Sequence, residues 1–460
     1  MTQRPQRSRR PRRAGTAIAA SAAAVLVALT AACAPGSGGD AGNAKAPSSV
    51  STDISKAGDV TLTVWDQEVR GGQNEQIEAL NAAFQKKYPN VTIKRTSKEF
   101  TDLKTTLRLA LSGQNPPDVV QANQGYGDMG AFVKAGMLVP LNKYADAYKW
   151  RDRYPKTLLA LNSFTPDGKT FGSGELYGLS QAGEMVGVYY NKEKLSELGI
   201  QQPKTWADFE AALRKAKDAG ELPIAFGNSD GFPAIHEYGV LQAQTAGKDA
   251  VRKLVFGQGG AWTDAPNTQA ATTLKTWNDK GFLTKDANGV SYDDSWQDFA
   301  DGEGVFVIAG TWLVPEFEKR GMGDKIGFML PPPAQAGAAS ATTGGEGLPF
   351  AVTSKSKHPD VAAAYLNFLT SPEAMDVLVD NDVLPAVTPA SKRPGGGLPG
   401  EVYAAWEASA KSDGLVPYLD YTTPSFYDTL SAELQRLLGG NASPEQVMQA
   451  AQKDYDDFTS

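Results

Sequence analysis

Carboxylates, amides and aromatic rings follow several predicted strands, where side chains from neighbouring strands can converge on a small molecule. A carboxylate or an amide can hydrogen-bond two neighbouring hydroxyl groups, and an aromatic ring can cover an apolar C–H face. This combination suits a neutral ligand that is rich in hydroxyl groups. In the N-terminal part of the chain the candidates are Asp66, Gln67, Glu68, Asn123, Gln124 and Tyr126. For the first three, capping of the following helix is the competing role.

A second set of ligand-binding candidates lies further along the chain. Tryptophan is ordinarily a core residue, yet three tryptophans stand in loops or at predicted strand ends. The glycine-rich run 344–347 could bring backbone N–H groups close to a ligand. His236 is interpreted as a structural histidine. The predicted ligand-binding residues of this part are Asn228, Tyr238, Trp262, Trp296, Trp312, Gly345, Glu346 and Phe426.

The composition gives little support to metal or cofactor chemistry. The chain has one cysteine, Cys33, and two histidines, so neither a disulfide nor a cysteine- or histidine-rich metal site is expected. Phosphate-binding-loop and zinc-peptidase helix motifs are missing. We therefore predict no metal and no cofactor, and we assign no catalytic residue.

The N-terminus has the pattern of an export signal. Residues 1–13 contain six arginines and no acid, and the uncharged stretch 14–32 precedes Cys33. Leu29-Thr30-Ala31-Ala32-Cys33 resembles a bacterial lipobox, with Thr30 where Leu is usual. We expect a signal peptide at 1–32 and a lipid (palmitate) on Cys33, at the outer face of the cell membrane. A retained signal anchor is the alternative, and the paired arginines leave Sec and twin-arginine export both open.

The residues after Cys33 predict a flexible tether. Residues 33–58 are rich in Gly, Ser, Ala and Pro and have no hydrophobic period. Removal of the six arginines of the leader lowers the formal net charge from −7 to −13. An acidic mature chain makes nucleic acid an unsuitable partner.

From residue 60 onward, predicted strands alternate with predicted helices. Residues 60–65 alternate like a strand, Ile77, Leu80 and Phe84 recur at helical spacing, and residues 91–93 form the next strand. This alternation predicts parallel sheets covered by helices. A mature chain of about 400 residues is better divided into two lobes than packed around one core.

Short motifs, in order along the chain, resemble family 1 extracellular solute-binding proteins of bacterial sugar importers, the group that includes maltose-binding protein. The first is Val64-Trp65-Asp66, and the most specific run is Val188-Tyr189-Tyr190-Asn191-Lys192. Later motifs are Pro203-Lys204-Thr205-Trp206 and Ala309-Gly310-Thr311-Trp312. Two departures, Leu179-Ser180-Gln181-Ala182-Gly183 and Gly304-Val305-Phe306-Val307-Ile308, indicate a subfamily with the same fold.

The resemblance implies an α/β, two-lobed periplasmic-binding-protein-like (type II) fold with the ligand cleft between the lobes. Lobe 1 is expected at 59–182 plus 328–372, and lobe 2 at 183–327 plus 373–460. The family often uses an acid at the first crossing, where Glu184 stands, and a stacking tryptophan at the position of Trp312.

The implied function is the binding of a carbohydrate, of oligosaccharide size, outside the cell and its delivery to the permease subunits of an ABC transporter. The protein is expected to act as a monomer and not as an enzyme. A surface glycoside hydrolase and a sugar-sensing receptor are the alternatives.

Overall fold

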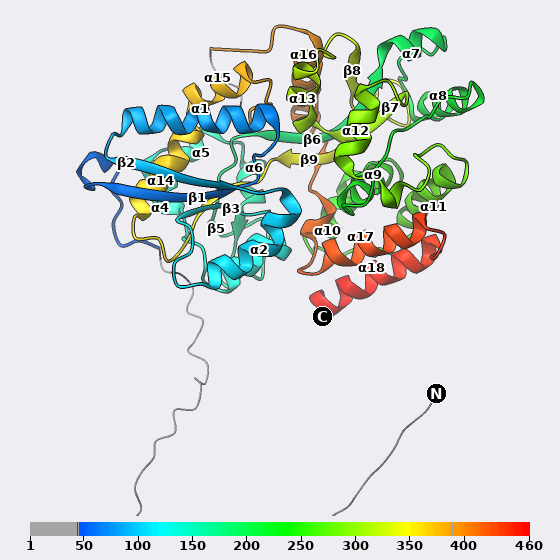
Figure 1. Cartoon of the computed structure of the whole chain (residues 1–460). Helices are drawn as coiled ribbons and strands as arrows, with labels where there is room; N and C mark the ends of the chain where they lie inside the picture. The colour runs from blue at the N-terminus through cyan, green and yellow to red at the C-terminus, as the bar shows by residue number, and fades with distance from the viewer. Residues whose placement is uncertain (1–43, 45, 388–390) are drawn as a thin grey trace, which may run out of the picture. The chain divides into compact units, whose positions relative to one another are not determined.

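The computed structural model describes residues 44, 46–387 and 391–460 (Figure 1). Cys33, the expected leader 1–32 and the first part of the expected tether lie outside the described residues. The end of that tether is packed on the folded unit, because Ile54 is buried and its carbonyl accepts a hydrogen bond from Asn90 Nδ2 at 3.1 Å. The chain is therefore fixed to the unit before residue 59, at the short 3₁₀ helix η1 (Ile54–Lys56).

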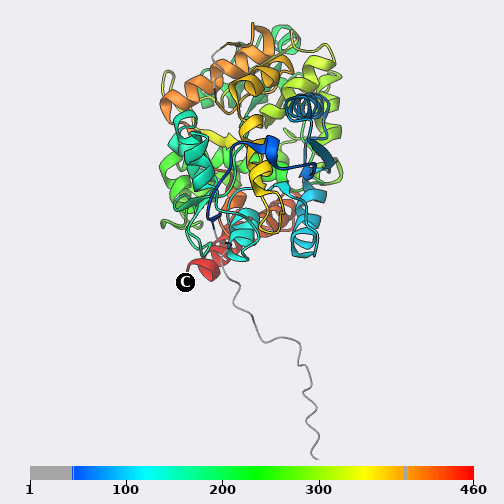
Figure 2. The same ribbon diagram turned by 90° about the vertical axis from the view of Figure 1, so that its left-hand side faces the viewer.

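The first lobe is built on a four-stranded sheet with the order β10-β3-β1-β2. Strands β1 (Val60–Asp66), β2 (Val91–Ser97) and β3 (Val119–Gln121) run parallel, and β10 (Phe350–Val352) pairs antiparallel with β3. Alternate residues of β1 are buried, as a strand with one face on the core requires. Helix α1 (Gly71–Lys87), seen end-on in Figure 2, connects β1 to β2.

The second lobe is built on five strands, of which β11-β9-β6-β7 form a path and β8 also pairs with β6. Every residue of β6 (Gly183–Asn191) is buried, so this strand is covered on both faces. Its neighbours are β7 (Phe306–Gly310), β8 (Ile326–Met329), β9 (Thr342–Glu346) and β11 (Leu415–Val416).

Helices account for most of the remaining chain (Figure 1). Those of the first lobe are α2 (Phe100–Ser112), α3 (Ala131–Lys134), α4 (Asn142–Ala147), α5 (Trp150–Arg153), α6 (Lys156–Leu161), α14 (Pro359–Leu369) and α15 (Pro372–Asp380), with the π-helical turn η2 (Tyr126–Gly130) and the strand pair β4 (Ser163–Phe164) and β5 (Glu175–Leu176). Those of the second lobe are α7 (Lys192–Glu197), α8 (Trp206–Asp218), α9 (Phe232–Thr245), α10 (Lys248–Val255), α11 (Ala265–Asp279), α12 (Tyr292–Ala300), α13 (Val314–Lys319), α16 (Gly397–Ser412), α17 (Phe426–Leu438) and α18 (Pro444–Thr459), with η3 (Ala287–Gly289), η4 (Thr311–Leu313) and η5 (Leu419–Tyr421).

The strand pairing locates the points at which the chain changes lobe. β6 begins the second sheet at Gly183, where the first crossing is expected. The return expected near Phe328 lies instead between Glu346 and Phe350, because β8 and β9 both pair with β6. The last crossing follows α15 and not Ser371, since α15 packs on α1 while α16 packs on β8.

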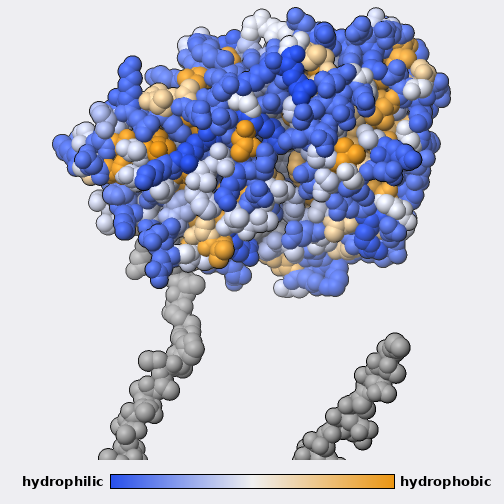
Figure 3. Space-filling view, in the orientation of Figure 1, coloured by the Kyte–Doolittle hydropathy of each residue, from blue (hydrophilic) through white to orange (hydrophobic). Residues whose placement is uncertain are grey.

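The surface on the face shown in Figure 3 is mostly hydrophilic, with small dispersed apolar groups. Among the residues that the structure describes, no helix has the combined length and apolar character needed to cross a lipid bilayer.

Candidate ligand-binding site

A cavity of about 360 Å³ lies between the two lobes and is lined by both of them. This volume falls within the range of about 300–1,000 Å³ that is usual for small-molecule sites. On the side of the first lobe, the lining residues follow β1 and β3 or begin α2. The cavity therefore lies beyond the carboxyl ends of the parallel strands, where open α/β sheets generally bind their ligands.

Four of the residues predicted from the sequence line this cavity: Gln67, Asn123, Glu184 and Trp312. Gln67 is the residue after β1, and its backbone N–H donates to Gln121 Oε1 at 2.7 Å. Asn123 follows β3 and donates from Nδ2 to Asp420 Oδ2 at 2.9 Å, which joins the first lobe to η5. Glu184 stands at the start of β6, and Trp312 lies in η4, directly after β7.

The second lobe presents a wall of aromatic rings to the cavity. The His236 ring lies 5.6 Å from the Trp312 ring and 5.3 Å from the Tyr418 ring, centroid to centroid. Trp312 Nε1 donates to Tyr292 Oη at 2.8 Å, which fixes the indole plane. Burial lowers the pKa of His236 to about 3, so its imidazole stays neutral. His236 thus belongs to the cavity lining, although a structural role was the favoured interpretation and ligand contact the alternative.

A second aromatic group connects the lobes on another side of the cavity. The Phe100 ring, at the start of α2, lies 6.2 Å from the ring of Phe232 and 6.2 Å from that of Tyr427. Both distances lie in the range of edge-to-face aromatic pairs. These rings restrict access of solvent to the cavity.

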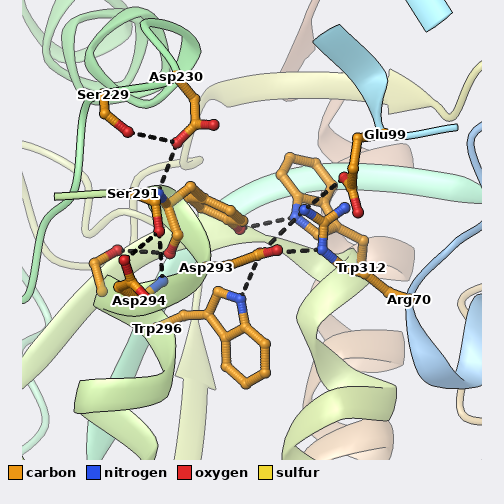
Figure 4. A network of polar contacts seen from close by, with 11 residues as sticks. Arg70, Glu99, Ser229, Asp230, Ser291, Asp293, Asp294, Trp296 and Trp312 are labelled. Atoms are coloured by element: carbon orange, nitrogen blue, oxygen red, sulfur yellow. Dashed lines mark hydrogen bonds and ion pairs between the residues drawn. The ribbon is translucent and has the colours of Figure 1, made fainter. Parts of the chain in front are cut away.

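A polar clasp, formed by Arg70, Glu99 and Asp293, also joins the lobes (Figure 4). The Arg70 guanidinium, just before α1, donates to Asp293 Oδ1 on α12 at 3.0 and 3.2 Å, and it lies 3.5 Å from Glu99 Oε2. Asp293 also accepts from Trp296 Nε1 at 2.8 Å. Because the arginine and its main partner belong to different lobes, this contact can exist only when the lobes are close together.

Glu184 and Tyr418 are buried polar residues of the lining whose side chains have no partner among the described residues. Glu184 is 8% exposed and its carboxylate takes part in no hydrogen bond there, while Tyr418 is 7% exposed and its Oη is equally unpaired. Burial, with a smaller contribution from the charge of Glu68, raises the pKa of Glu184 to about 8. An unpaired buried polar atom is unfavourable, so a ligand that supplies partners to these two groups is stabilised by them.

The other N-terminal candidates are engaged by contacts within the protein and do not line the cavity. The Asp66 carboxylate is fully buried and accepts hydrogen bonds from Arg95 Nε at 2.7 Å and Nη2 at 2.9 Å. The two residues meet because Arg95 stands on the adjacent strand β2. Glu68 accepts from Gln121 Nε2 at 2.7 Å. Gln124 Nε2 donates to the carbonyl of Gly347 at 3.1 Å. Tyr126 Oη donates to the carbonyl of Lys169, and its ring packs between Phe164 and Phe458.

The remaining candidates of the second lobe are also placed outside the cavity lining. Asn228 accepts from the backbone of Ala234 at 3.0 Å and so holds the start of α9. Tyr238 is fully buried against Met448. The rings of Trp262 and Phe426 pack on each other with their centroids 4.5 Å apart. Trp296 donates a hydrogen bond from Nε1 to Asp293, which is itself a lining residue.

Two candidates of the glycine-rich run belong to β9 and not to the cavity. Gly345 pairs with Glu184 in the second sheet. Glu346 is buried and accepts from Asn162 Nδ2, and burial holds its pKa well above the ordinary range. These residues shape the strand beneath the cavity.

Several lining residues were not predicted from the sequence. The sequence around Arg70, Asp293 and Tyr292 shows only a polar loop and a helix start. No hydrophobic periodicity marks the short segment that carries Tyr418, Asp420 and Tyr421. Their position depends on tertiary packing. A closer signal existed for Tyr427, since it neighbours the predicted Phe426 and is the member of that pair that lines the cavity.

One segment beside the cavity, residues 227–231, has the Gly-Xaa-Ser-Xaa-Gly pattern of hydrolase nucleophiles. Its Ser229 is exposed and donates to Asp230 Oδ2 at 3.3 Å, and its φ is not positive. Neither histidine forms a hydrogen bond with it. Within the described ranges, no group of three His, Cys, Asp or Glu side chains is placed to hold a metal ion.

The fold and the cavity together define the class of protein: a two-lobed protein that encloses a small ligand between α/β lobes. Comparisons with known proteins agree with this class. A family profile described as bacterial extracellular solute-binding protein matches residues 71–376. The chain therefore belongs to the bacterial extracellular solute-binding protein family, and the family and the two-lobed fold predicted from the sequence are confirmed.

Individual relatives are distant but cover most of the chain. The multiple sugar-binding protein of Streptococcus mutans is 24% identical over 335 residues, which are 72% of this chain and 76% of that protein. The melibiose/raffinose/stachyose-binding protein MelE of Bacillus subtilis is 22% identical over 409 residues, 86% of this chain and 89% of MelE. A solved chitin oligosaccharide binding protein has a TM-score of 0.76 at 24% identity, over 87% of this chain and 99% of that one.

Proposed function

We propose that the protein binds a carbohydrate in the cavity between its lobes and delivers it to the membrane subunits of an ABC importer. The observation that carries the proposal is the aromatic wall of His236, Trp312 and Tyr418, which faces amide and carboxylate groups of the first lobe across an enclosed cavity. Aromatic faces suit sugar C–H groups, and the polar groups suit hydroxyls. Relatives named for multiple sugars and for raffinose-type sugars support this class of ligand.

In the proposed complex, Trp312 stacks on a sugar ring. Gln67 and Asn123 bind hydroxyl groups from the side of the first lobe, and Glu184 and Tyr418 bind them from the side of the second lobe. Each neutral hydrogen bond contributes about 0.5–1.5 kcal/mol net, so these converging groups must act together to hold the sugar.

The proposed location is the outer face of the cell membrane, with a lipid on Cys33 as the anchor. The family supports an extracellular protein, whereas the anchor rests on the lipobox-like residues 29–33. Metabolic labelling with a palmitate analogue tests it: wild type is expected to be labelled, and Cys33→Ala unlabelled and released from the cell.

We propose that the protein binds its carbohydrate without hydrolysing it. The family and its structural relatives are binding proteins, and Ser229 lacks the surroundings of a nucleophile. Calorimetry against a panel of oligosaccharides, followed by mass spectrometry of the recovered sugar, tests both parts. We expect saturable binding and unchanged sugar; absence of binding contradicts the proposed function, and shortened sugar supports the glycoside hydrolase alternative.

A further inference from the structure

Charged groups in the lining of the cavity are strongly biased toward acids. Six carboxyl side chains line it: Glu99, Asp102, Glu184, Asp230, Asp293 and Asp420. The single basic lining residue with a permanent charge is Arg70, and the neighbouring His236 is neutral. Carboxylates also accept hydrogen bonds from the hydroxyl groups of a neutral sugar, so the partners of each acid, and not the number of acids, select the ligand.

Internal partners neutralise only part of the excess. Arg70 is already engaged by Asp293 and Glu99. Asp230 and Asp420 accept hydrogen bonds from uncharged donors, the backbone N–H of Tyr292 and Asn123 Nδ2. Burial raises the pKa of the lining residue Asp420, and Lys104, whose charge opposes this shift, is paired with Asp128 at 3.0 Å. A helix N-terminus carries about half a positive charge, so the starts of α2 and α12 offset about one further charge and leave the cavity negative.

Glu184 is a lining carboxyl without a counter-charge among the described residues: burial keeps it largely protonated in the ligand-free protein, and a cation that enters with the ligand would ionise it. Its side chain is more than nine-tenths buried, it lines the cavity, and no described residue gives it a hydrogen bond or an ion pair. Tyr418 also lines the cavity, and its hydroxyl has no hydrogen-bond partner among the described residues. Burial, followed by the charge of Glu184, raises the pKa of this hydroxyl. Both groups are thus arranged for a partner that arrives with the ligand.

The aromatic lining favours the same partner. An ammonium group within about 6 Å of an aromatic face gains roughly 0.5–2 kcal/mol, most in a desolvated site. Trp312, Tyr418 and Tyr292 supply such faces next to the acids. A carboxylate beside aromatic rings therefore selects a protonated amine.

We propose that the ligand is an amino-substituted saccharide whose protonated amine pairs with Glu184 and lies against the aromatic wall. This inference rests on the proposed carbohydrate function and specifies its substrate class. Hydroxyl groups of the same sugar remain partners for Gln67 and Asn123.

Calorimetry on matched sugar pairs tests the inference. Each pair consists of a saccharide with a hydroxyl at C2 and its 2-amino counterpart: glucose and glucosamine, galactose and galactosamine, cellobiose and the β-1,4-linked glucosamine disaccharide. We expect the amine to bind at least about tenfold more tightly than the hydroxyl form in at least one pair, and to lose this advantage in concentrated salt. Hydroxyl forms that bind equally well or better overturn the inference and leave the proposed function standing. Absence of binding by every member overturns the inference, and the oligosaccharide panel described above then decides the proposed function.

The variant Glu184→Gln locates the effect, because it keeps the size of the side chain and removes its charge. Its affinity for the amine is expected to fall at least about tenfold, with less than a threefold change for the hydroxyl form. Glu303→Gln, an exposed position outside the cavity, serves as the matched control. Thermal unfolding of each variant confirms that it is folded; a folded Glu184→Gln protein that keeps the amine preference overturns the assignment to Glu184.

Discussion

Glu184 combines burial with the absence of a counter-charge, and this has a consequence for stability. Its folded-state pKa, about 8, lies above the ordinary 4.5 because of burial and the nearby Glu68, against a smaller effect of Arg70. Glu346 on β9 and Tyr418 also face it. Between these two pKa values the folded protein binds more protons than the unfolded chain, so its stability falls as pH rises.

We therefore predict that Glu184→Gln removes part of this pH dependence. The stability of the variant relative to wild type should increase by on the order of 3 kcal/mol between about pH 5 and pH 8. Glu68, whose pKa burial raises to about 7, keeps a residual slope in the variant. Urea unfolding at both pH values measures the difference, and parallel curves for the two proteins would contradict the account.

Tyr418 provides a second test of a binding role, since its buried Oη has no partner in the described structure. Tyr418→Phe removes an unpaired hydroxyl, so the melting temperature should stay the same or rise. Affinity for the ligand should fall by about 0.5–1.5 kcal/mol, because one hydrogen bond to it is lost. A lower melting temperature with unchanged affinity would show that the hydroxyl is structural.

Individual side chains also show where prediction from sequence stops. Gln67 and Asn123 could be found because each follows a recognisable strand, whereas Glu184 and, in part, Trp312 were indicated by the family resemblance. Asp66 carries an equally suitable carboxylate in the same place, but Arg95 on β2 neutralises it. The sequence gives no means of knowing that strands 60–66 and 91–97 bring these two residues together.

Among the elements, the clasp between the start of α1 and α12 is the contact most specific to the closed arrangement. Arg70 bridges to Asp293 and lies over the ring of Tyr292 at 5.8 Å. The Arg70 side chain is 19% exposed and that of Asp293 is 40% exposed, so removal of Arg70 leaves a partly solvated carboxylate and takes away the contact between the lobes.

We predict that Arg70→Ala shifts the ligand-free protein toward an open arrangement. Small-angle scattering should show a larger radius of gyration for the variant than for wild type. Lys392→Ala is the control, because Lys392 pairs with Asp380 far from the cavity lining. An identical radius for Arg70→Ala and wild type would mean that the clasp does not hold the lobes.

The order of strands and helices was predictable, whereas the assignment of late elements to lobes was not. The sequence predicts the alternating burial of β1 and the strand β6, whose apolar run at residues 186–190 is visible in it. The placement of β9 beside β6, which moves the second crossing beyond Glu346, depends on a long-range antiparallel pairing of residues about 160 apart. Local patterns carry no information about such a pairing.

At the scale of the whole molecule, two lobes that are joined by several chain crossings can close around a ligand. A ligand that contacts both lobes stabilises the closed form by its differential affinity for that form. We predict that a saturating saccharide makes the Arg70→Ala protein compact again, so that its scattering profile returns to that of wild type. A profile that sugar leaves unchanged would contradict closure on the ligand.

Calorimetric titration of wild type and Trp312→Ala with the same saccharide measures whether a sugar binds in the cavity against Trp312. Trp206→Ala, which removes a partly buried tryptophan of α8 outside the cavity, is the matched control. The account predicts that Trp312→Ala weakens binding by about 1–3 kcal/mol and that the control binds like wild type. Equal affinity of wild type and Trp312→Ala would contradict it.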